Sequence, residues 1–166
     1  MRPSPRRVFL FIFAASAALI ATAIFYFQEQ LGLDPCPMCV LQRYAFILTA
    51  AVALVAAIHG PKRGVALKIY GGTIALIALA GAGVAIRHSY LQHFPPKVET
   101  CGSDLEFIMN TFSLSQALPK IFAGTGSCSA VHWRMLGLSI PEWALVGFAV
   151  FAGLAIWVAF VRKPAR

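Results

Sequence analysis

The sequence predicts an all-α integral membrane protein, a four-transmembrane-helix bundle with two extracytoplasmic loops, the second long and partly amphipathic-helical. Hydrophobic residues make up 59% of the 166 residues and charged residues only 12%, and the mean hydropathy is +0.75. Soluble domains contain only about 45–50% apolar residues. In addition, four apolar stretches are long enough to cross a bilayer. These observations predict a single membrane domain over residues 1–166.

The transmembrane spans are expected at residues 8–27, 41–59, 65–86 and 143–161. The first span carries no charge. The second continues from a polar turn, which places Arg43 near the membrane interface. The third contains Lys68 one turn inside its end, where the ammonium group can reach the headgroups. The fourth has Trp143 and Trp157 near its ends, the usual position of interfacial tryptophans.

Basic residues predict the orientation of the spans. The two termini and the region between the second and third spans carry bases and no acid: Arg2, Arg6, Arg7, Lys62, Arg63, Lys68, Arg162, Lys163 and Arg166. The opposite side holds all six acidic residues together with the other bases. By the positive-inside rule both termini are cytoplasmic. The net charge of +8 is therefore an orientation signal, and no nucleic-acid partner is expected.

A cleavable signal peptide is the alternative for the N-terminus, because Arg6 and Arg7 precede an apolar core and Ala21-Thr22-Ala23 resembles a cleavage site. The apolar run continues past that site and is long enough to span the membrane. A retained first helix is therefore the favoured interpretation.

The four cysteines lie in the two predicted outer loops: Cys36 and Cys39 in residues 28–40, and Cys101 and Cys128 in residues 87–142. The first and third loops of a four-span bundle lie on the same side of the membrane, so all the thiols share one compartment. The charge bias makes this compartment extracytoplasmic and oxidising, where disulfides form and persist.

Four cysteines allow three disulfide connectivities, which the sequence leaves open. Two structural disulfides are one alternative, favoured for Cys101 and Cys128 taken alone. The C-x-x-C spacing of Cys36 and Cys39 is typical of dithiol exchange. Zinc is disfavoured, because the second pair forms no further C-x-x-C and no histidine stands at ligand spacing beside either pair. No metal is expected.

The residues around the C-x-x-C favour reactive thiols. With Pro37 in the first helical turn and Asp34 as a possible cap, the pair lies at the positive end of a helix dipole, which lowers thiol pKa values. Arg43 follows Cys39 by four residues, so on a helix its guanidinium lies on the same face and can stabilise a thiolate or an anionic partner. The alternative for Arg43 is an interfacial residue that only reaches the headgroups.

The long outer loop is expected to contain short amphipathic segments on the membrane surface. Its apolar residues between 103 and 122 recur at a roughly helical spacing that Pro119 interrupts. Packing in the core explains any single one of them equally well. Cys101 follows a polar run and Cys128 follows a glycine-rich turn, so both are expected in mobile segments.

Together these motifs resemble the DsbB family of bacterial inner-membrane disulfide-generating proteins. The resemblance covers nearly the whole chain. It rests on PCPMCVLQRYA at residues 35–45, RHSYLQHFPP at residues 87–96, GTGSC at residues 124–128 and the pattern W-x-x-L-G-L-S-I-P-E-W at residues 133–143. The vitamin K epoxide reductase family has a similar bundle but places its loop cysteines before the C-x-x-C. The order of cysteines in this chain therefore favours DsbB.

The resemblance implies that a quinone, ubiquinone or menaquinone, binds beside Cys36 and Cys39. Cys39 would be the thiolate that donates electrons to the quinone, with Arg43 stabilising both the thiolate and the quinone anion. His88 corresponds to a histidine of the family's quinone pocket, and an ordinary interfacial histidine is the alternative. Family members vary in the two residues between the cysteines, so the redox potential of this pair stays open.

For the second cysteine pair, the resemblance implies exchange with a periplasmic thioredoxin-like protein of the DsbA type. A partner thiolate attacks Cys101 and frees Cys128, which attacks Cys36; a transient Cys36–Cys128 disulfide forms and Cys39 leaves as a thiolate. A DsbA-like partner, at about −120 mV, needs a more positive electron acceptor, which membrane quinone supplies.

The expected function is therefore that of a thiol:quinone oxidoreductase of the bacterial inner membrane, with its cysteines in the periplasm. A small transporter is the first alternative, but Lys68 is the only strongly charged candidate within the spans. A structural membrane protein with inert loop disulfides is the second, and it has no need of Arg43. A mixed disulfide trapped through Cys101 separates the expected function from both alternatives.

Overall fold

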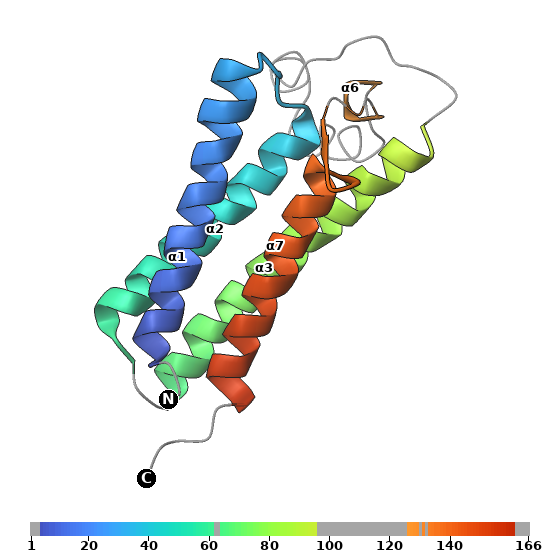
Figure 1. The fold of residues 1–166 in the computed structure, drawn as a ribbon. Coiled ribbons are helices and arrows are strands. Elements are labelled where there is room, and N and C mark those ends of the chain that lie inside the picture. Colours follow the sequence, from blue (N-terminus) through green and yellow to red (C-terminus); the bar gives the residue numbers. More distant parts are fainter. Residues whose placement is uncertain (1–3, 62–63, 96–125, 130, 132, 162–166) are drawn as a thin grey trace, which may run out of the picture.

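Four long helical rods form the molecule (Figure 1). The structure, a computed structural model, describes residues 4–61, 64–95, 126–129, 131 and 133–161. The rods are α1 (Pro5–Ala21) continued by the π-helix η1 (Thr22–Gln30), α2 (Pro37–His59), α3 (Val65–His93), and α7 (Ile140–Ile156) continued by the π-helix η2 (Trp157–Val161). All four are long and apolar enough to cross a membrane. The predicted all-α, four-span fold class is confirmed.

The helices extend beyond several of the predicted spans. The first rod continues to Gln30, α2 begins at Pro37, and α3 runs to His93. As a result, His88 lies within α3 and not in a loop. The predicted spans concern only the part of each helix inside the bilayer, so their limits stay predictions.

The start of α2 differs from the sequence prediction in its cap. Asp34 is not the N-cap; Cys36 occupies that position, and its sulfur accepts a hydrogen bond from the backbone N–H of Cys39 at 3.4 Å. Pro37 takes the first helical position, where its missing N–H needs no partner. The helix ends at Gly60, whose φ of 63° gives the left-handed C-cap that glycine accommodates without strain. The C-x-x-C motif is thus itself the beginning of α2.

Small residues meet inside the bundle where α3 and α7 pack, and many large apolar residues face outward. A Cβ atom on Gly71 of α3 would lie 2.5 Å from the Cβ of Ala159 and 2.9 Å from the carbonyl oxygen of Ala155. Outside, Phe25, Ile58 and Leu76 are 67%, 73% and 71% exposed. Close backbone approach through small residues is typical of helix packing in lipid, where burying large apolar groups gives no advantage. This pattern supports the membrane assignment independently of hydropathy.

A short hairpin precedes α7, which sequence analysis did not predict. Strand β1 (Arg134–Met135) pairs antiparallel with β2 (Leu138–Ser139). The two turn residues, Leu136 and Gly137, have φ values of 55° and 84°, as in the type I′ turns that suit two-residue hairpins. A four-residue helix, α6 (Gly126–Ser129), lies next to α3.

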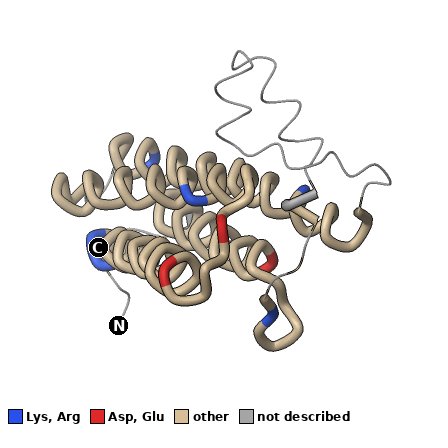
Figure 2. The backbone as a smooth tube through the Cα atoms, turned by 90° about the horizontal axis from the view of Figure 1, so that it is seen from above, with Lys and Arg blue, Asp and Glu red and all other residues tan. Residues whose placement is uncertain are grey.

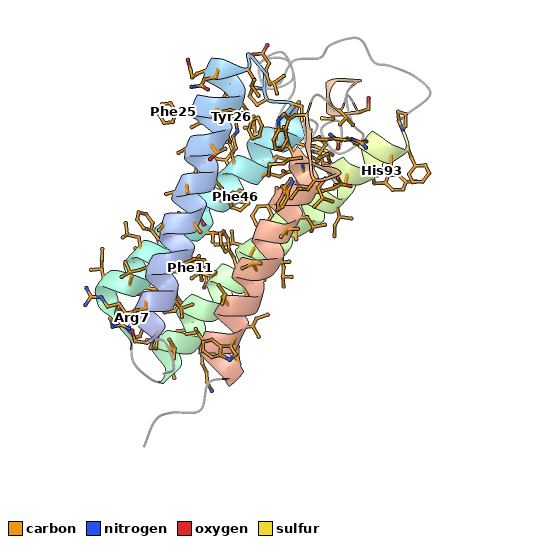
Figure 3. The ribbon with its side chains drawn as sticks, in the orientation of Figure 1. Arg7, Phe11, Phe25, Tyr26, Phe46 and His93 are labelled. Atoms are coloured by element: carbon orange, nitrogen blue, oxygen red, sulfur yellow. The ribbon has the colours of Figure 1, made fainter. Side chains whose placement is uncertain are left out.

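The start of the first rod and the C-x-x-C motif lie at opposite ends of the bundle. The first rod begins and the last rod ends at the same end (Figure 1). Arg7 lies at this end, and His93 lies at the opposite end (Figure 3). The described part of the chain carries few charged residues, as Figure 2 shows from above. The C-x-x-C motif and α6 lie at the end marked by His93.

Candidate active site

Cys36 and Cys39 form a close dithiol at the start of α2. Both are free thiols, and their sulfur atoms are 3.1 Å apart, with the Cys36 thiol donating to the Cys39 sulfur. Cys36 is buried and Cys39 is partly exposed. The first turn of a helix presents unpaired N–H groups and the positive end of the helix dipole, which favours a thiolate over a thiol. Two features therefore favour a thiolate at Cys39: the hydrogen bond from the Cys36 thiol and the position of Cys39 in the first turn of α2.

Cys128 lies against this dithiol, although it is far away in the sequence. It is fully buried in α6, and its side chain packs in one cluster with Cys36 and Leu91. Hydrogen bonding to Cys128, and then to Cys39, raises the pKa of Cys36, and burial raises it further. Cys36 therefore keeps its proton when the pair is reduced. The predicted fourth redox cysteine, Cys101, lies outside the described residues.

His88 reaches the dithiol from α3. Its Nε2 atom is 3.7 Å from the Cys36 sulfur, and its Nδ1 atom is 3.1 Å from the side-chain nitrogen of Gln42. Since an amide nitrogen only donates, Nδ1 accepts, and the proton of the neutral ring is on Nε2, facing Cys36. Both His88 and Gln42 are buried. Of the two alternatives that the sequence left for His88, an ordinary interfacial position does not describe this environment.

Gln42 was missed by the sequence analysis. It was visible as a polar residue inside an apolar span, three positions after Cys39 and therefore on the same helix face. Buried polar groups inside a membrane helix are costly unless they find a partner, which made it a functional candidate. Its partner, His88, is separated from it by 46 residues, so no local pattern could have identified the pair.

Arg43 is fixed by the first rod. Its guanidinium donates to the side-chain oxygen of Gln28 and, at 3.1 Å, to the carbonyl oxygen of Ala23. Both acceptors belong to η1 and are uncharged. Among the residues that the structure describes, no carboxylate forms an ion pair with Arg43. Its positive charge is therefore held in place near Cys39 without being neutralised by a protein anion.

A cavity of about 380 Å³ extends from the dithiol into the bundle. It lies between the first rod, α2, α7 and the hairpin, and its lining is mostly apolar. Most of the polar lining groups lie on or next to α2 and α3 and include Cys36, Cys39, Gln42, Arg43 and His88; Thr22 and Asp34 also line the cavity. Small-molecule sites typically combine such an apolar wall with a few polar groups that orient the ligand.

Aromatic rings bound this cavity. Trp133, just before the hairpin, packs edge-on against Phe27 of η1, with ring centroids 4.9 Å apart, and both line the cavity. Deeper in the bundle, Phe46 lines the cavity and stacks on Phe148, with centroids 4.0 Å apart and planes 9° from parallel. Figure 3 shows Phe46 between the level of Tyr26 and that of Phe11. The cavity thus suits a flat, apolar ring with polar atoms at one edge.

Comparisons with known proteins agree with this geometry. The family described as "DsbB: Disulfide bond formation protein DsbB" matches residues 5–158. The Disulfide bond formation protein B of Azoarcus sp. (strain BH72) is 48% identical over 158 residues, which cover 95% of this chain and 94% of the relative. That of Aromatoleum aromaticum is 49% identical over 154 residues, 92% of this chain and 91% of the relative. That of Chromobacterium violaceum is 43% identical over 157 residues, 94% of this chain and 92% of the relative.

The family match and these similarities extend over almost the full length of each chain, and they include the helices that carry the dithiol, Arg43 and His88. The name shared by these relatives agrees with a buried dithiol in contact with a third cysteine. On this basis the chain belongs to the DsbB family of disulfide bond formation proteins.

Proposed function

We propose that this protein is a thiol:quinone oxidoreductase, which reoxidises a periplasmic dithiol protein of the DsbA type and passes the electrons to membrane quinone. One observation carries the proposal. The Cys36–Cys39 dithiol lies at the junction between a third cysteine, Cys128, and an apolar cavity that contains the Arg43 cation. A structural disulfide needs neither the cavity nor the cation.

The cavity fits a quinone headgroup by size, shape and donor set. Its volume of about 380 Å³ is within the usual range for small-molecule sites. Arg43 offers N–H donors to a carbonyl oxygen, and His88 lines the same cavity from α3. When bound there, a quinone would supply an acceptor for two electrons and two protons. Which quinone is used does not follow from these residues.

Within the dithiol, the two cysteines have different roles. Cys36 retains its proton and donates to the Cys39 sulfur. Cys39 lines the cavity, receives that hydrogen bond, and lies one helical turn from Arg43. Charge-assisted hydrogen bonding and the helix dipole both stabilise its thiolate. Cys39 is therefore the electron donor to the acceptor in the cavity, as the family resemblance implied.

On the other side of the dithiol, Cys128 is placed for exchange with Cys36. Their side chains are hydrogen-bonded, so little movement is needed for one sulfur to attack the other. In the proposed sequence, a partner thiolate attacks Cys101 and forms a mixed disulfide, and the freed Cys128 thiolate attacks Cys36 and expels the Cys39 thiolate. The partner's second thiolate then displaces Cys101, so that the partner leaves as a disulfide, and Cys101 displaces Cys36 from Cys128, which leaves Cys36 and Cys39 as the reduced pair. The two protons of the partner's thiols are released, and two protons are taken up when the electrons reach the acceptor.

The proposed location is the bacterial inner membrane, with both termini cytoplasmic and the cysteines periplasmic. The first rod begins and the last rod ends at the same end of the bundle (Figure 1), which supports a common side for both termini. Arg6, Arg7 and Lys68 belong to that end, which agrees with the positive-inside rule. Thiols on the opposite side would meet the oxidising compartment that disulfide transfer requires.

A quinone-reduction assay tests this function. Purified protein is mixed with a reduced DsbA-type protein and a soluble ubiquinone or menaquinone analogue, and quinone absorbance is followed. Wild-type protein should reduce quinone with simultaneous oxidation of the partner, whereas Cys39→Ser should not. Lys68→Ala, which removes an exposed cation at the far end, is the matched control for Arg43→Ala. Quinone reduction by Cys39→Ser at the wild-type rate would show that the proposed electron path is wrong.

A trapping experiment tests the partner. Cys36→Ala removes the disulfide that Cys128 attacks, and in Cys128→Ala the lone Cys101 thiolate can attack the disulfide of an oxidised DsbA-type protein, so in both variants a mixed disulfide between Cys101 and that protein should accumulate. It is detected by non-reducing electrophoresis, and Cys101→Ala added to either variant should remove it. Formation of the same adduct without Cys101 would exclude the proposed order of exchange.

A further inference from the structure

We propose that the reduced protein has a buried zinc-binding site formed by the sulfur atoms of Cys36 and Cys39 and by Nε2 of His88. These three ligand atoms all lie within 4.8 Å of one another, the only such group of three among the residues that the structure describes. The sequence argued against zinc because no histidine is near either cysteine pair. The fold removes this objection by bringing α3 against the start of α2.

The distances are close to those that zinc requires. With Zn–S about 2.3 Å and Zn–N about 2.0–2.1 Å in a tetrahedron, ligand sulfurs are about 3.8 Å apart and sulfur and nitrogen about 3.5 Å apart. Here the sulfur–sulfur distance is 3.1 Å and the distance from the Cys36 sulfur to Nε2 is 3.7 Å. The sulfurs therefore need to separate by only about 0.7 Å to accept the ion.

Gln42 can support the coordinated histidine. A ligating Nε2 atom has no proton, so the ring proton must move to Nδ1, which then becomes a donor. A rotated Gln42 amide presents its oxygen to Nδ1 in place of its nitrogen, at the 3.1 Å separation already present. Hydrogen bonds of this kind orient ligating histidines, and their loss typically weakens metal binding about tenfold or more.

Charge balance restricts this site to the reduced protein. Zn²⁺ is bound by both sulfurs as thiolates, so Cys36 gives up its proton on binding, and the two thiolates neutralise the ion. A Cys36–Cys39 disulfide has no thiolates and does not bind it. Cys128, which contacts Cys36, is available as a fourth ligand, and water is the usual fourth ligand otherwise. If the proposed function holds, zinc inhibits the enzyme by withholding both sulfurs from exchange.

Metal binding is measured on full-length protein reduced with a phosphine, without partner or quinone. Co²⁺ serves as the optical probe, since tetrahedral thiolate coordination gives visible bands, and Zn²⁺ affinity follows from displacement of Co²⁺. One ion should bind per reduced chain and none per oxidised chain. Cys36→Ser, Cys39→Ser and His88→Ala should each weaken binding at least about tenfold, and Gln42→Leu should weaken it less.

Cys101→Ser is the matched control, because it removes a thiol of the other pair and should leave Co²⁺ binding unchanged. Loss of binding in this variant, or wild-type affinity in both Cys36→Ser and His88→Ala, would overturn the proposed site. Circular dichroism of each variant checks that the helices are intact. Because the measurement needs neither turnover nor an electron acceptor, a failure of the proposed function would not change its outcome.

Discussion

The two sides of helix α7 differ in how tightly they pack against their neighbours. Against α3 it is packed so closely that Gly71 has no room for even a methyl group beside Ala155 and Ala159. Towards the first rod it makes few contacts, and residues of both, including Leu19 and Gly147, line the cavity. In lipid, helices associate through close packing, and a gap between them loses that attraction. The comparison indicates that α3–α7 packing holds the bundle, while the opposite side of α7 borders the cavity.

The largest expected effect comes from disrupting the α3–α7 interface. Gly71→Leu places a side chain where a Cβ atom alone would meet Ala159 at 2.5 Å. We expect a loss of about 3 kcal/mol in the free energy of unfolding, at the upper end of overpacking costs. The measurement is thermal unfolding in detergent. Gly72→Leu is the control, because its Cβ would have no atom within 4 Å; equal losses at both positions would contradict the role given to this interface.

On the open side, the next effect concerns the charge. Arg43→Gln removes the cation from the cavity but keeps a hydrogen-bonding side chain. Hydrogen bonds to charged groups contribute about 1.5–3 kcal/mol, so quinone reduction should fall by roughly 10- to 100-fold. Arg43→Lys should restore part of it. The assay is the initial rate at saturating reduced partner, and a comparable fall in Lys68→Gln would indicate a general charge effect.

Filling the cavity should produce a smaller, more selective effect. Gly147 lines the cavity, and a Cβ there would lie 3.4 Å from both Leu19 and Phe46, which is tight but tolerable. Gly147→Leu should raise the KM for quinone at least about tenfold, equivalent to about 1.4 kcal/mol of lost binding. Its unfolding temperature should stay near that of Gly72→Leu. Unchanged KM in a folded variant would mean that the acceptor does not use this cavity.

The smallest predicted effect separates two buried polar residues of α2. Gln42→Leu leaves Nδ1 of His88 without its donor, and a lost neutral hydrogen bond costs about 1 kcal/mol, or roughly a fivefold slower turnover. Thr49→Val is the matched control, because the buried Thr49 hydroxyl has no hydrogen-bond partner in the described structure. Its turnover should be unchanged. If both substitutions slowed turnover equally, Gln42 would contribute only to packing and not to the orientation of His88.

Much of this architecture was predictable because its signals are local. Apolar length predicted the four helices, and the spacing of Cys39 and Arg43 predicted that both lie on one helix face. The partners of these residues were not predictable. Arg43 is held by Gln28 and Ala23, and these contacts depend on how two helices meet.

Three local features were also missed or wrong. The N-cap of α2 is Cys36 and not Asp34, because the first helical residue is Pro37 and the N-cap is the residue directly before it. The π-helical η1 has no marked sequence signal, since its composition resembles that of any apolar helix end. The hairpin before α7 had a signal in Gly137, which has the positive φ that glycine favours.

The position of the stacked Phe46 and Phe148 rings bears on whether the membrane potential affects the proposed reaction. Beyond them, the buried polar groups of the described helices are the hydroxyls of Ser16 and Thr49, and the hydrogen-bonded pair His59 and Tyr70 lies near the far end. Among the described residues, no chain of buried titratable groups links that end to the cavity. Under the proposed function, protons released by the partner's thiols and protons taken up at the cavity are therefore exchanged with the same aqueous side. Moving one charge across a bilayer involves about 2.3 kcal/mol per 100 mV. Disulfide formation would then be electroneutral, neither driven nor opposed by the membrane potential.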